Sequence, residues 1–331
     1  MSPEKIAVLG AGSWGTAMAI MMARAGHHVT LWGHDPAHIA KLTADRRNAD
    51  FLPDNPFPET LTLSDQLEET VSAHDFLMFA VPSHAFRETL LKSKAYLTDN
   101  AIVTWITKGF ETDTGLLAHE VVEDALGKNT PMALISGPSF ALEVAQDLPT
   151  AVVVASPDIS IANRVANTLR TSNFLSFASN NIASAEIGGA MKNVLAIAAG
   201  ISDGLGYGAN ARAAIITLGL AEMVQLGHFY KCSERSFLGL AGVGDLVLTC
   251  TDNKSRNRRL GLMLGQGKTM AEAKLKIGQE VEGVHAAREV HTICQKWGIE
   301  MPICNQIYRI LYDQLNPEVA VRYLLSIAQR M

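Results

Sequence analysis

Three charged residues occur in surroundings that suit chemistry better than simple solvation. The first is Lys192, the only cation in the stretch 182–201, which is otherwise rich in alanine, isoleucine and glycine and predicts a helix. A lysine on a mostly buried helix needs a partner or a function. Burial also lowers the pKa of an amine toward neutrality, as proton transfer requires. The alternative is a lysine that reaches solvent from the edge of the helix.

Asp245 and Lys108 are the candidates to act with Lys192. Asp245 ends the glycine-rich stretch 239–245 and is the natural partner of the Lys192 ammonium. Lys108 lies in the loop 107–111, directly after a predicted strand. Ligands of open α/β sheets bind outside the carboxyl ends of the strands, so a lysine there suits a phosphate or a carbonyl oxygen. An exposed loop lysine without a role is the alternative for Lys108.

A glycine motif predicts a dinucleotide site. The sequence Gly10-Ala-Gly-Ser-Trp-Gly15 follows the apolar run 6–9 and precedes a predicted helix, 16–25. In such a motif the first glycine permits a tight turn, the second lets the backbone approach a pyrophosphate, and the third allows close packing of helix on strand. The start of the helix then offers free N–H groups to the phosphates.

The end of the second predicted strand bears on the choice of cofactor. NAD-specific enzymes carry Asp or Glu there, whereas this chain has Gly33 followed by His34. Gly33 brings no carboxylate to repel a 2′-phosphate, and His34 could donate a hydrogen bond to one. We therefore expect NADPH to be accepted, with NADH as an alternative. Two other interpretations stay open: Asp35 as the ribose-binding acid, and His34 as an exposed turn residue.

A short basic segment suggests an anion site in the second half of the chain. Ser255 is placed to cap the start of a helix, which puts Arg256 and Asn257 in its first turn. That position favours anions, and arginine suits phosphate. The alternative is a solvated basic patch.

Composition limits the classes of protein. The chain has 331 residues with 28 Lys and Arg against 33 Asp and Glu, a net charge of −5, which argues against general binding of nucleic acid or anionic membranes. The four cysteines form no Cys-x-x-Cys pair, so we expect neither a metal site nor a disulfide framework. We find no apolar run suited to cross a membrane and expect a cytoplasmic protein.

The predicted elements define two domains. Apolar strand-like runs alternate with helix-length segments in the first half, which predicts a mainly parallel sheet covered on both faces. After about residue 179 strand-like runs nearly vanish and helical spacing dominates, as in 183–201 and 211–227. We place the domains at 1–182 and 183–331. The expected strands are 6–9, 29–32, 76–81, 101–106, 132–135 and 151–155, and the Pro-rich piece 51–58 is expected to be a loop.

Taken together, these motifs resemble the bacterial type of NAD(P)-dependent glycerol-3-phosphate dehydrogenase. The matching pieces run in family order over nearly the whole chain. They are the glycine motif through Ala17, Ala80-Val-Pro-Ser83, Lys108-Gly-Phe-Glu111, Ser136-Gly-Pro-Ser-Phe-Ala141, Gly189-Ala-Met-Lys-Asn193, Leu240-Ala-Gly-Val-Gly-Asp-Leu246, Leu248-Thr-Cys-Thr251, Ser255-Arg-Asn257 and Val281-Glu-Gly283.

The resemblance implies an α/β plus all-α fold, with an N-terminal doubly wound Rossmann domain and a C-terminal helical domain like that of 6-phosphogluconate dehydrogenase. It implies reversible reduction of dihydroxyacetone phosphate to sn-glycerol 3-phosphate with NADPH or NADH, a place in glycerophospholipid synthesis, and a homodimer. The catalytic positions are then Lys192, the proton donor and acceptor at the C2 oxygen, Lys108 and Asp245. The substrate-binding positions are Lys108, Gly137, Ser139, Lys192, Asp245, Ser255, Arg256 and Asn257. The cofactor-binding positions are Gly10, Gly12, Ser13, Trp14, Gly15, His34, Phe51, Lys108, Ala141, Arg256 and Glu282.

The sequence departs from the family pattern at three positions. The family commonly has Arg where His34 stands, Tyr where Phe51 stands, and an apolar residue where Glu280 stands. Two other functions remain open on the residues alone. One is a related reductase of a carboxylate ketone or hydroxy acid, such as ketopantoate, because arginine grips carboxylates as well as phosphates. The other is a dinucleotide-sensing module that lacks turnover.

Overall fold

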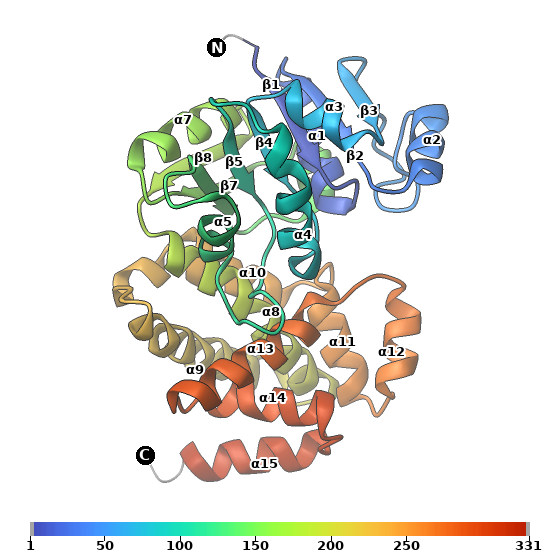
Figure 1. Ribbon diagram of the computed structural model, residues 1–331. Coiled ribbons are helices and arrows are strands. Elements are labelled where there is room, and N and C mark those ends of the chain that lie inside the picture. Colours follow the sequence, from blue (N-terminus) through green and yellow to red (C-terminus); the bar gives the residue numbers. More distant parts are fainter. Residues whose placement is uncertain (1–2, 329–331) are drawn as a thin grey trace. The chain divides into compact units, whose positions relative to one another are not determined.

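The computed structural model describes residues 3–328 and divides the chain into two compact units (Figure 1). The sheet unit comprises Met1–Thr107 and Ala118–Ile182. The helical unit comprises Lys108–Leu117 and Ala183–Met331. The segment 108–117 therefore belongs to the helical unit, although it lies between two strands of the sheet along the chain.

The sheet unit is built on one eight-stranded sheet with the order β3-β2-β1-β4-β5-β6-β7-β8. Neighbouring strands are parallel except for the antiparallel pair β6 and β7. The first six positions have the strand order of a Rossmann fold. The strands are β1 (Lys5–Leu9), β2 (His28–Trp32), β3 (Leu61–Ser64), β4 (Phe76–Phe79), β5 (Ile102–Trp105), β6 (Met132–Ser136), β7 (Thr150–Ala155) and β8 (Phe174–Ser179).

Helices cross between these strands. They are α1 (Ser13–Arg24), α2 (Pro36–Asp45), α3 (Leu67–Ser72), α4 (Ser83–Ser93), the short 3₁₀ helix η1 (Lys94–Tyr96), α5 (Ala118–Leu126), α6 (Ala141–Ala145) and α7 (Ile159–Leu169). Nine consecutive residues of α1, from Gly15 to Ala23, are buried in the core of the unit. Small and unbranched side chains dominate this stretch, so the helix can pack closely on β1 and on α6.

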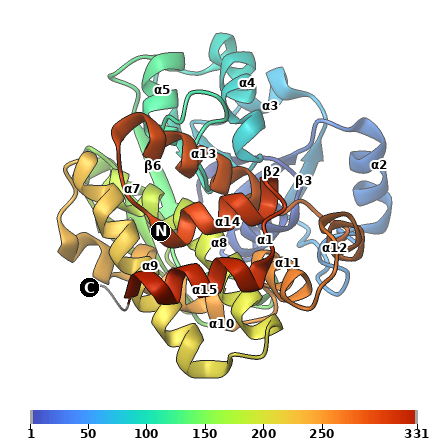
Figure 2. The same ribbon diagram turned by 90° about the horizontal axis from the view of Figure 1, so that it is seen from below.

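The helical unit has a core of its own, centred on α8. Its elements are α8 (Ile182–Gly204), α9 (Gly208–Phe229), the 3₁₀ helix η2 (Glu234–Leu238), the π-helical turn η3 (Leu240–Gly244), α10 (Asp245–Thr251), α11 (Arg256–Gly265), α12 (Met270–Ile277), α13 (Glu282–Trp297), α14 (Pro302–Tyr312) and α15 (Pro317–Ala328). The last three pack in chain order, α13 on α14 and α14 on α15 (Figure 2).

Helix α8 is long and apolar enough to cross a membrane, judged by length and composition alone. The sequence had been expected to contain no such segment. The most apolar 18-residue window of α8 has a mean hydropathy of 1.2, but 94% of that window is buried in the structure. Glycines explain how closely it packs: a Cβ on Gly200 would lie 2.1 Å from the Arg258 carbonyl oxygen, and one on Gly261 would lie 2.1 Å from that of Ile197. The apolar surface of α8 is therefore buried inside the helical unit, in part by direct contact with the backbone of α11.

The expected strands are present with boundaries within about two residues. Two strands were missed, β3 and β8. β3 has only four residues, and β8 alternates buried and exposed side chains, with Leu175 and Phe177 facing solvent. α1 begins at Ser13 rather than Thr16, because the glycine motif itself supplies the first helical turn.

Candidate active site

The two lysines and the aspartate singled out in the sequence form one buried cluster in the helical unit. Lys192 Nζ lies 2.5 Å from Asp245 Oδ1, and Lys108 Nζ lies 2.8 Å from Asp245 Oδ2. The side chain of Asp245 is fully buried, and those of the two lysines are 9–10% exposed. One carboxylate thus holds two ammonium groups, and the cluster carries a net positive charge that suits an anionic substrate.

Local sequence explains why these groups meet. Gly188 lies one turn before Lys192 on α8, and a Cβ there would lie only 2.1 Å from the carbonyl oxygen of Ala241 in η3. The glycine therefore lets the backbone of η3 rest directly on α8. Because α10 begins at Asp245, directly after η3, this contact delivers the carboxylate to the lysine.

The electrostatics of the cluster favour proton transfer by Lys192. Burial lowers its pKa from 10.5 to about 8, the Asp245 charge opposes this shift, and the Lys108 charge adds to it. A pKa near 8 lets an amine both give and accept a proton near neutral pH. Sequence reasoning expected this lowering, and the structure assigns its causes.

The segment 255–257 forms the start of α11. The Ser255 side chain accepts a hydrogen bond from the Arg258 N–H at 3.2 Å, which confirms the predicted N-cap. Arg256 is partly buried in the first turn. The Asn257 side chain makes hydrogen bonds within the protein. Its Nδ2 donates to Asn193 Oδ1 and its Oδ1 accepts from Gly283 N, both at 2.9 Å. Asn257 therefore joins α8, α11 and α13.

Arg258 was missed by the sequence analysis, which treated it as part of a basic run. It is buried, and its guanidinium donates to the Cys250 carbonyl oxygen at 3.0 Å, to Asn253 and to Asp203. These bonds tie the loop before Ser255 to α8. The spacing of apolar residues along the sequence does not indicate such a residue, because its bonds form only when the loop before α11 packs against α8.

Glu282 lies at the start of α13 near the same cations. Its Oε2 accepts from Asn193 Nδ2 at 3.5 Å. Burial raises its pKa, while the charges of Arg256, Lys108 and Lys192 oppose the rise and that of Glu280 adds to it. The charges of Arg256, Lys108 and Lys192 thus all act on Glu282 in the helical unit.

In the sheet unit, the glycine motif has the geometry of a pyrophosphate cradle. Gly10 has φ +128°, and a Cβ there would lie 2.7 Å from the Ala80 carbonyl oxygen; one on Gly15 would lie 2.0 Å from that of Gly10. A Cβ on Gly12 would meet nothing within 4 Å among the described residues. Within residues 3–328, no side chain caps α1 and no acidic residue lies in its first turn, where Ser13 and Trp14 are partly exposed. Open space beside uncapped N–H groups fits the phosphates of a dinucleotide.

Asn48 makes hydrogen bonds to this turn, and the sequence analysis did not identify it. It is fully buried, and its Nδ2 donates to the Ala11 carbonyl oxygen at 3.0 Å and to Thr16 Oγ1 at 2.9 Å. Only its neighbour Phe51 was singled out from this loop; Phe51 is partly buried and makes an edge contact with His38.

At the end of β2, the structure shows what each of the three candidate residues contacts. Asp35 is the N-cap of α2, and its Oδ1 accepts from Ala37 N at 2.9 Å. A Cβ on Gly33 would lie 2.8 Å from Ile39 Cδ1, so an acid there would displace Ile39. His34 is exposed between them. Asp35 thus uses one carboxylate oxygen as a helix cap, and the His34 side chain makes no hydrogen bond among the described residues.

The remaining predicted residues of the sheet unit lie after β6. Gly137 has φ +146°, and its Cβ position is 3.1 Å from the Cα of Val152. Ser139 Oγ donates to the Gly137 carbonyl oxygen at 2.9 Å, and Ala141 begins α6.

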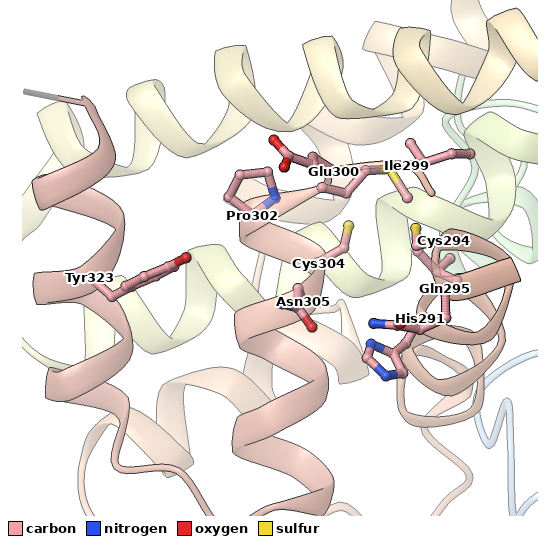
Figure 3. Close-up of a pocket in the computed structure, with 11 residues that line it drawn as sticks. His291, Cys294, Gln295, Ile299, Glu300, Pro302, Cys304, Asn305 and Tyr323 are labelled. Carbon is pink, nitrogen blue, oxygen red and sulfur yellow. The ribbon is translucent and has the colours of Figure 1, made fainter. Parts of the chain in front are cut away.

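A pocket of about 460 Å³ opens elsewhere in the helical unit (Figure 3). Among the described residues that line it are Val290, His291, Cys294, Gln295, Ile299, Glu300, Met301, Pro302, Cys304, Asn305 and Tyr323, and the predicted site residues are not among them. Burial raises the pKa of the Cys294 thiol to about 12 and the pKa of the Cys304 thiol well above its usual value, which disfavours the thiolate form of both.

A dinucleotide cradle on a Rossmann sheet and a lysine–aspartate–lysine cluster in a helical unit together define a class, the NAD(P)-dependent oxidoreductases. Comparison with models of known protein families identifies the family within this class. The chain matches the models of the NAD-dependent glycerol-3-phosphate dehydrogenase N-terminus over residues 5–162 and C-terminus over residues 181–322. The chain belongs to this family.

Named relatives agree with this assignment. Glycerol-3-phosphate dehydrogenase [NAD(P)+] from Aeromonas salmonicida is 50% identical over 97% of this chain and 96% of its own length. The enzyme of the same name from Edwardsiella ictaluri is 50% identical over 98% of this chain and 96% of its own length. The crystal structure of glycerol-3-phosphate dehydrogenase from Coxiella burnetii superposes with a TM-score of 0.94 at 45% identity, covering 98% of this chain and 99% of that one. The predicted family, fold class, NAD(P) cofactor and type of enzyme are thereby confirmed.

Proposed function

We propose that this chain catalyses the reversible reduction of dihydroxyacetone phosphate to sn-glycerol 3-phosphate, with NADPH as reductant and NADH as an alternative. The observation that carries this proposal is the buried cluster in which Asp245 holds both Lys108 and Lys192. The substrate class comes from the relatives, which are named glycerol-3-phosphate dehydrogenase [NAD(P)+].

The nicotinamide, when bound, supplies and recovers the hydride. As hydride reaches C2 of the ketone, negative charge develops on the C2 oxygen, and the protonated Lys192 gives that oxygen its proton. In the reverse direction the neutral amine takes the proton from the C2 hydroxyl. Asp245 orients the Lys192 ammonium through the bond to Nζ. Lys108 stabilises the developing oxyanion, and preorganised charge of this kind is usually a large part of catalysis.

The start of α11 is proposed to bind the substrate phosphate. Arg256 supplies a guanidinium, Ser255 and the first-turn N–H groups surround it, and Asn257 fixes the segment against α8 and α13. Phosphate binding then orients C2 for reaction. Gly137 and Ser139 are proposed to contribute further substrate contacts, as the resemblance implies.

Replacing Arg256 with methionine is expected to raise KM for dihydroxyacetone phosphate by about 10- to 100-fold, because a charge-assisted phosphate contact is worth about 1.5–3 kcal/mol. Steady-state kinetics at saturating NADPH measure this. Lys254→Met is the matched control, since Lys254 is a more exposed cation two residues away that pairs with Asp252. A variant in which only the affinity for NADPH changes would contradict the phosphate assignment.

The cofactor is proposed to bind on the sheet unit at the glycine turn, with further contacts from residues that the resemblance assigns. The turn supplies Gly10, Gly12, Ser13, Trp14 and Gly15; the others are His34, Phe51, Lys108, Ala141, Arg256 and Glu282.

His34→Asp is expected to lower the preference for NADPH over NADH by at least about tenfold, because a carboxylate there would repel the 2′-phosphate and accept from the 2′-hydroxyl. The ratio of kcat/KM for the two cofactors measures it. His28→Asp introduces the same change at the opposite end of β2 and should leave the ratio unaltered. An unchanged ratio in His34→Asp would remove His34 from the cofactor site.

We further propose that the protein is a cytoplasmic homodimer that supplies glycerol phosphate for phospholipid synthesis, without inserting into membranes. These assignments follow from the resemblance and the acidic charge balance. Light scattering of the purified protein would test the dimer, and a monomer at micromolar concentration would refute it.

The proposed reaction is tested by following the absorbance of reduced nicotinamide with dihydroxyacetone phosphate, using NADPH and NADH in turn. Unphosphorylated dihydroxyacetone and ketopantoate are the control substrates. Oxidation that requires the phosphorylated three-carbon ketone supports the proposal. Turnover of ketopantoate alone would favour a carboxylate reductase, and NADPH binding without any turnover would favour a sensing module.

A further inference from the structure

The loop 46–60, between α2 and β3, is fixed to the sheet unit at its start, middle and end (Figure 1). Leu52 and Phe57 are 2% and 7% exposed and belong to the core of that unit. The Arg46 guanidinium donates to the Pro58 carbonyl oxygen at 2.6 Å, which joins the two ends of the loop. A side chain carried by so anchored a loop can hold a defined position.

Asn48, in the first part of this loop, contacts the glycine turn directly. It is 0% exposed, and its Nδ2 donates both hydrogens, one to the Ala11 carbonyl oxygen at 3.0 Å and one to Thr16 Oγ1 at 2.9 Å. The backbone carbonyl of Asn48 accepts from the Leu52 N–H at 2.7 Å, which ties Asn48 to the anchored part of the loop. One amide group thus holds the turn at two points, one before α1 and one near its start.

The bond to Ala11 sets the direction in which the next N–H group points. A peptide unit is planar and trans, so the Ala11 carbonyl oxygen and the Gly12 N–H point in opposite directions. Because the carbonyl oxygen is held by the fully buried Asn48, the Gly12 N–H is directed away from that side chain. Gly12 is partly exposed, and its N–H donates to no atom of residues 3–328. The bond therefore leaves this N–H available to a phosphate.

Stability alone would not favour an amide at this position. Asn48 Oδ1 is buried and has no hydrogen-bond partner within residues 3–328. A buried acceptor without a partner is unfavourable for folding. An apolar side chain of the same size would avoid that penalty, so the benefit of an amide lies in the two bonds made by Nδ2.

We propose that Asn48 is a positioning residue for the cofactor, which holds the Ala11 carbonyl oxygen and thereby aims the Gly12 N–H at the pyrophosphate of the dinucleotide. Asn48 acts through the backbone of the turn and is itself fully buried. The inference rests on the proposed cofactor site at the glycine turn. It gives the loop 46–60 a second role beside that of Phe51, which the resemblance assigns to cofactor binding.

The test uses two variants of the full-length protein that keep the size of the side chain. Asn48→Leu removes both donors, and Asn48→Asp places oxygen atoms where the Ala11 carbonyl needs a donor. Both are expected to raise the Kd for NADPH, measured by fluorescence titration, by about 10- to 100-fold, the effect of losing one charge-assisted hydrogen bond. At saturating NADPH, kcat should stay within about threefold, because Lys108 and Lys192 belong to the helical unit.

Fragments of the cofactor separate positioning from a general loss of structure. The fragment 2′-phospho-ADP-ribose contains the pyrophosphate, whereas adenosine 2′-monophosphate lacks it. In both variants the inhibition constant of the first should rise as the Kd for NADPH does, and that of the second should stay within about twofold. A residue that merely stabilised the sheet unit would weaken the binding of both fragments alike.

Asn55→Leu is the matched control. Asn55 is another buried asparagine of the same loop, 3% exposed, but its Nδ2 makes no hydrogen bond within residues 3–328. Its replacement should leave the Kd for NADPH within about twofold of the unaltered value. If Asn48→Leu does not fold, Asn48→Asp and Asn48→Ala complete the test.

The outcomes separate two failures. An unchanged affinity for NADPH in the folded Asn48 variants, or an equal loss for both fragments, would overturn the positioning role. Unaltered protein that binds NADPH without reducing dihydroxyacetone phosphate would overturn the proposed reaction, while the predicted fragment pattern would still support the role of Asn48. Unaltered protein that binds neither NADPH nor NADH would overturn both.

Discussion

Replacing Lys192 with methionine is expected to lower kcat for ketone reduction by a factor of about 10³ or more. The variant loses the proton donor, which contributes about 10²–10⁴-fold in general acid catalysis, and one of two cations near the developing oxyanion. Lys108 retains its bond to Asp245, so the carboxylate keeps one partner and the fold should survive.

Steady-state rates and NADPH binding measured by fluorescence check this expectation together. NADPH affinity should change little, because the glycine turn lies on the sheet unit. Lys296→Met, an exposed lysine of α13, is the control and should be fully active. A rate within tenfold of the unaltered enzyme would remove Lys192 from the mechanism.

The second large effect is expected for Asp245→Asn, which keeps the shape of the side chain and removes its charge. Two ammonium groups that are 9–10% exposed would then face each other without a carboxylate. Breaking a buried ion pair from one side costs about 3–5 kcal/mol. Because the Asp245 charge opposes the lowering of the Lys192 pKa, its loss lowers that pKa further and depletes the proton donor at neutral pH.

We therefore expect Asp245→Asn to lower both the midpoint of chemical unfolding and kcat, the latter by about 100-fold. Circular dichroism against denaturant and steady-state rates measure the two effects. Glu222→Gln neutralises a buried carboxyl that faces backbone N–H groups instead of cations, and should affect stability with little loss of rate. Asp245→Asn with unaltered rate would show that the carboxylate does not orient Lys192.

The buried lysine–aspartate cluster could be predicted in part, because charged side chains are unusual in apolar stretches of sequence. A lone cation in an apolar helix indicated Lys192, and an acid at the end of a glycine-rich turn indicated its partner Asp245. The glycine motif was recognisable because its spacing is imposed by backbone contacts, such as that of Gly15 with the Gly10 carbonyl oxygen.

What the sequence did not reveal depends on tertiary packing. Nothing local in 108–117 shows that Phe110 and Leu117 join the helical core instead of the sheet. Asn48 and Arg258 lie in polar stretches typical of loops, and only the folded chain shows them buried and bonded to backbone carbonyls. The edge strands β3 and β8 lack the fully buried runs of the central strands, so their pattern was too weak to identify.

The central claim is that Lys192, with a pKa lowered to about 8, is the proton donor and acceptor. Its most direct test is the pH dependence of kcat/KM in both directions from about pH 7 to pH 10, where the substrate phosphate, with a second pKa of about 6, is already ionised. Reduction should be constant below about pH 8 and fall tenfold per pH unit above it, while oxidation of glycerol 3-phosphate should rise to a plateau over the same range. Reduction that stays flat across this whole range would contradict the account.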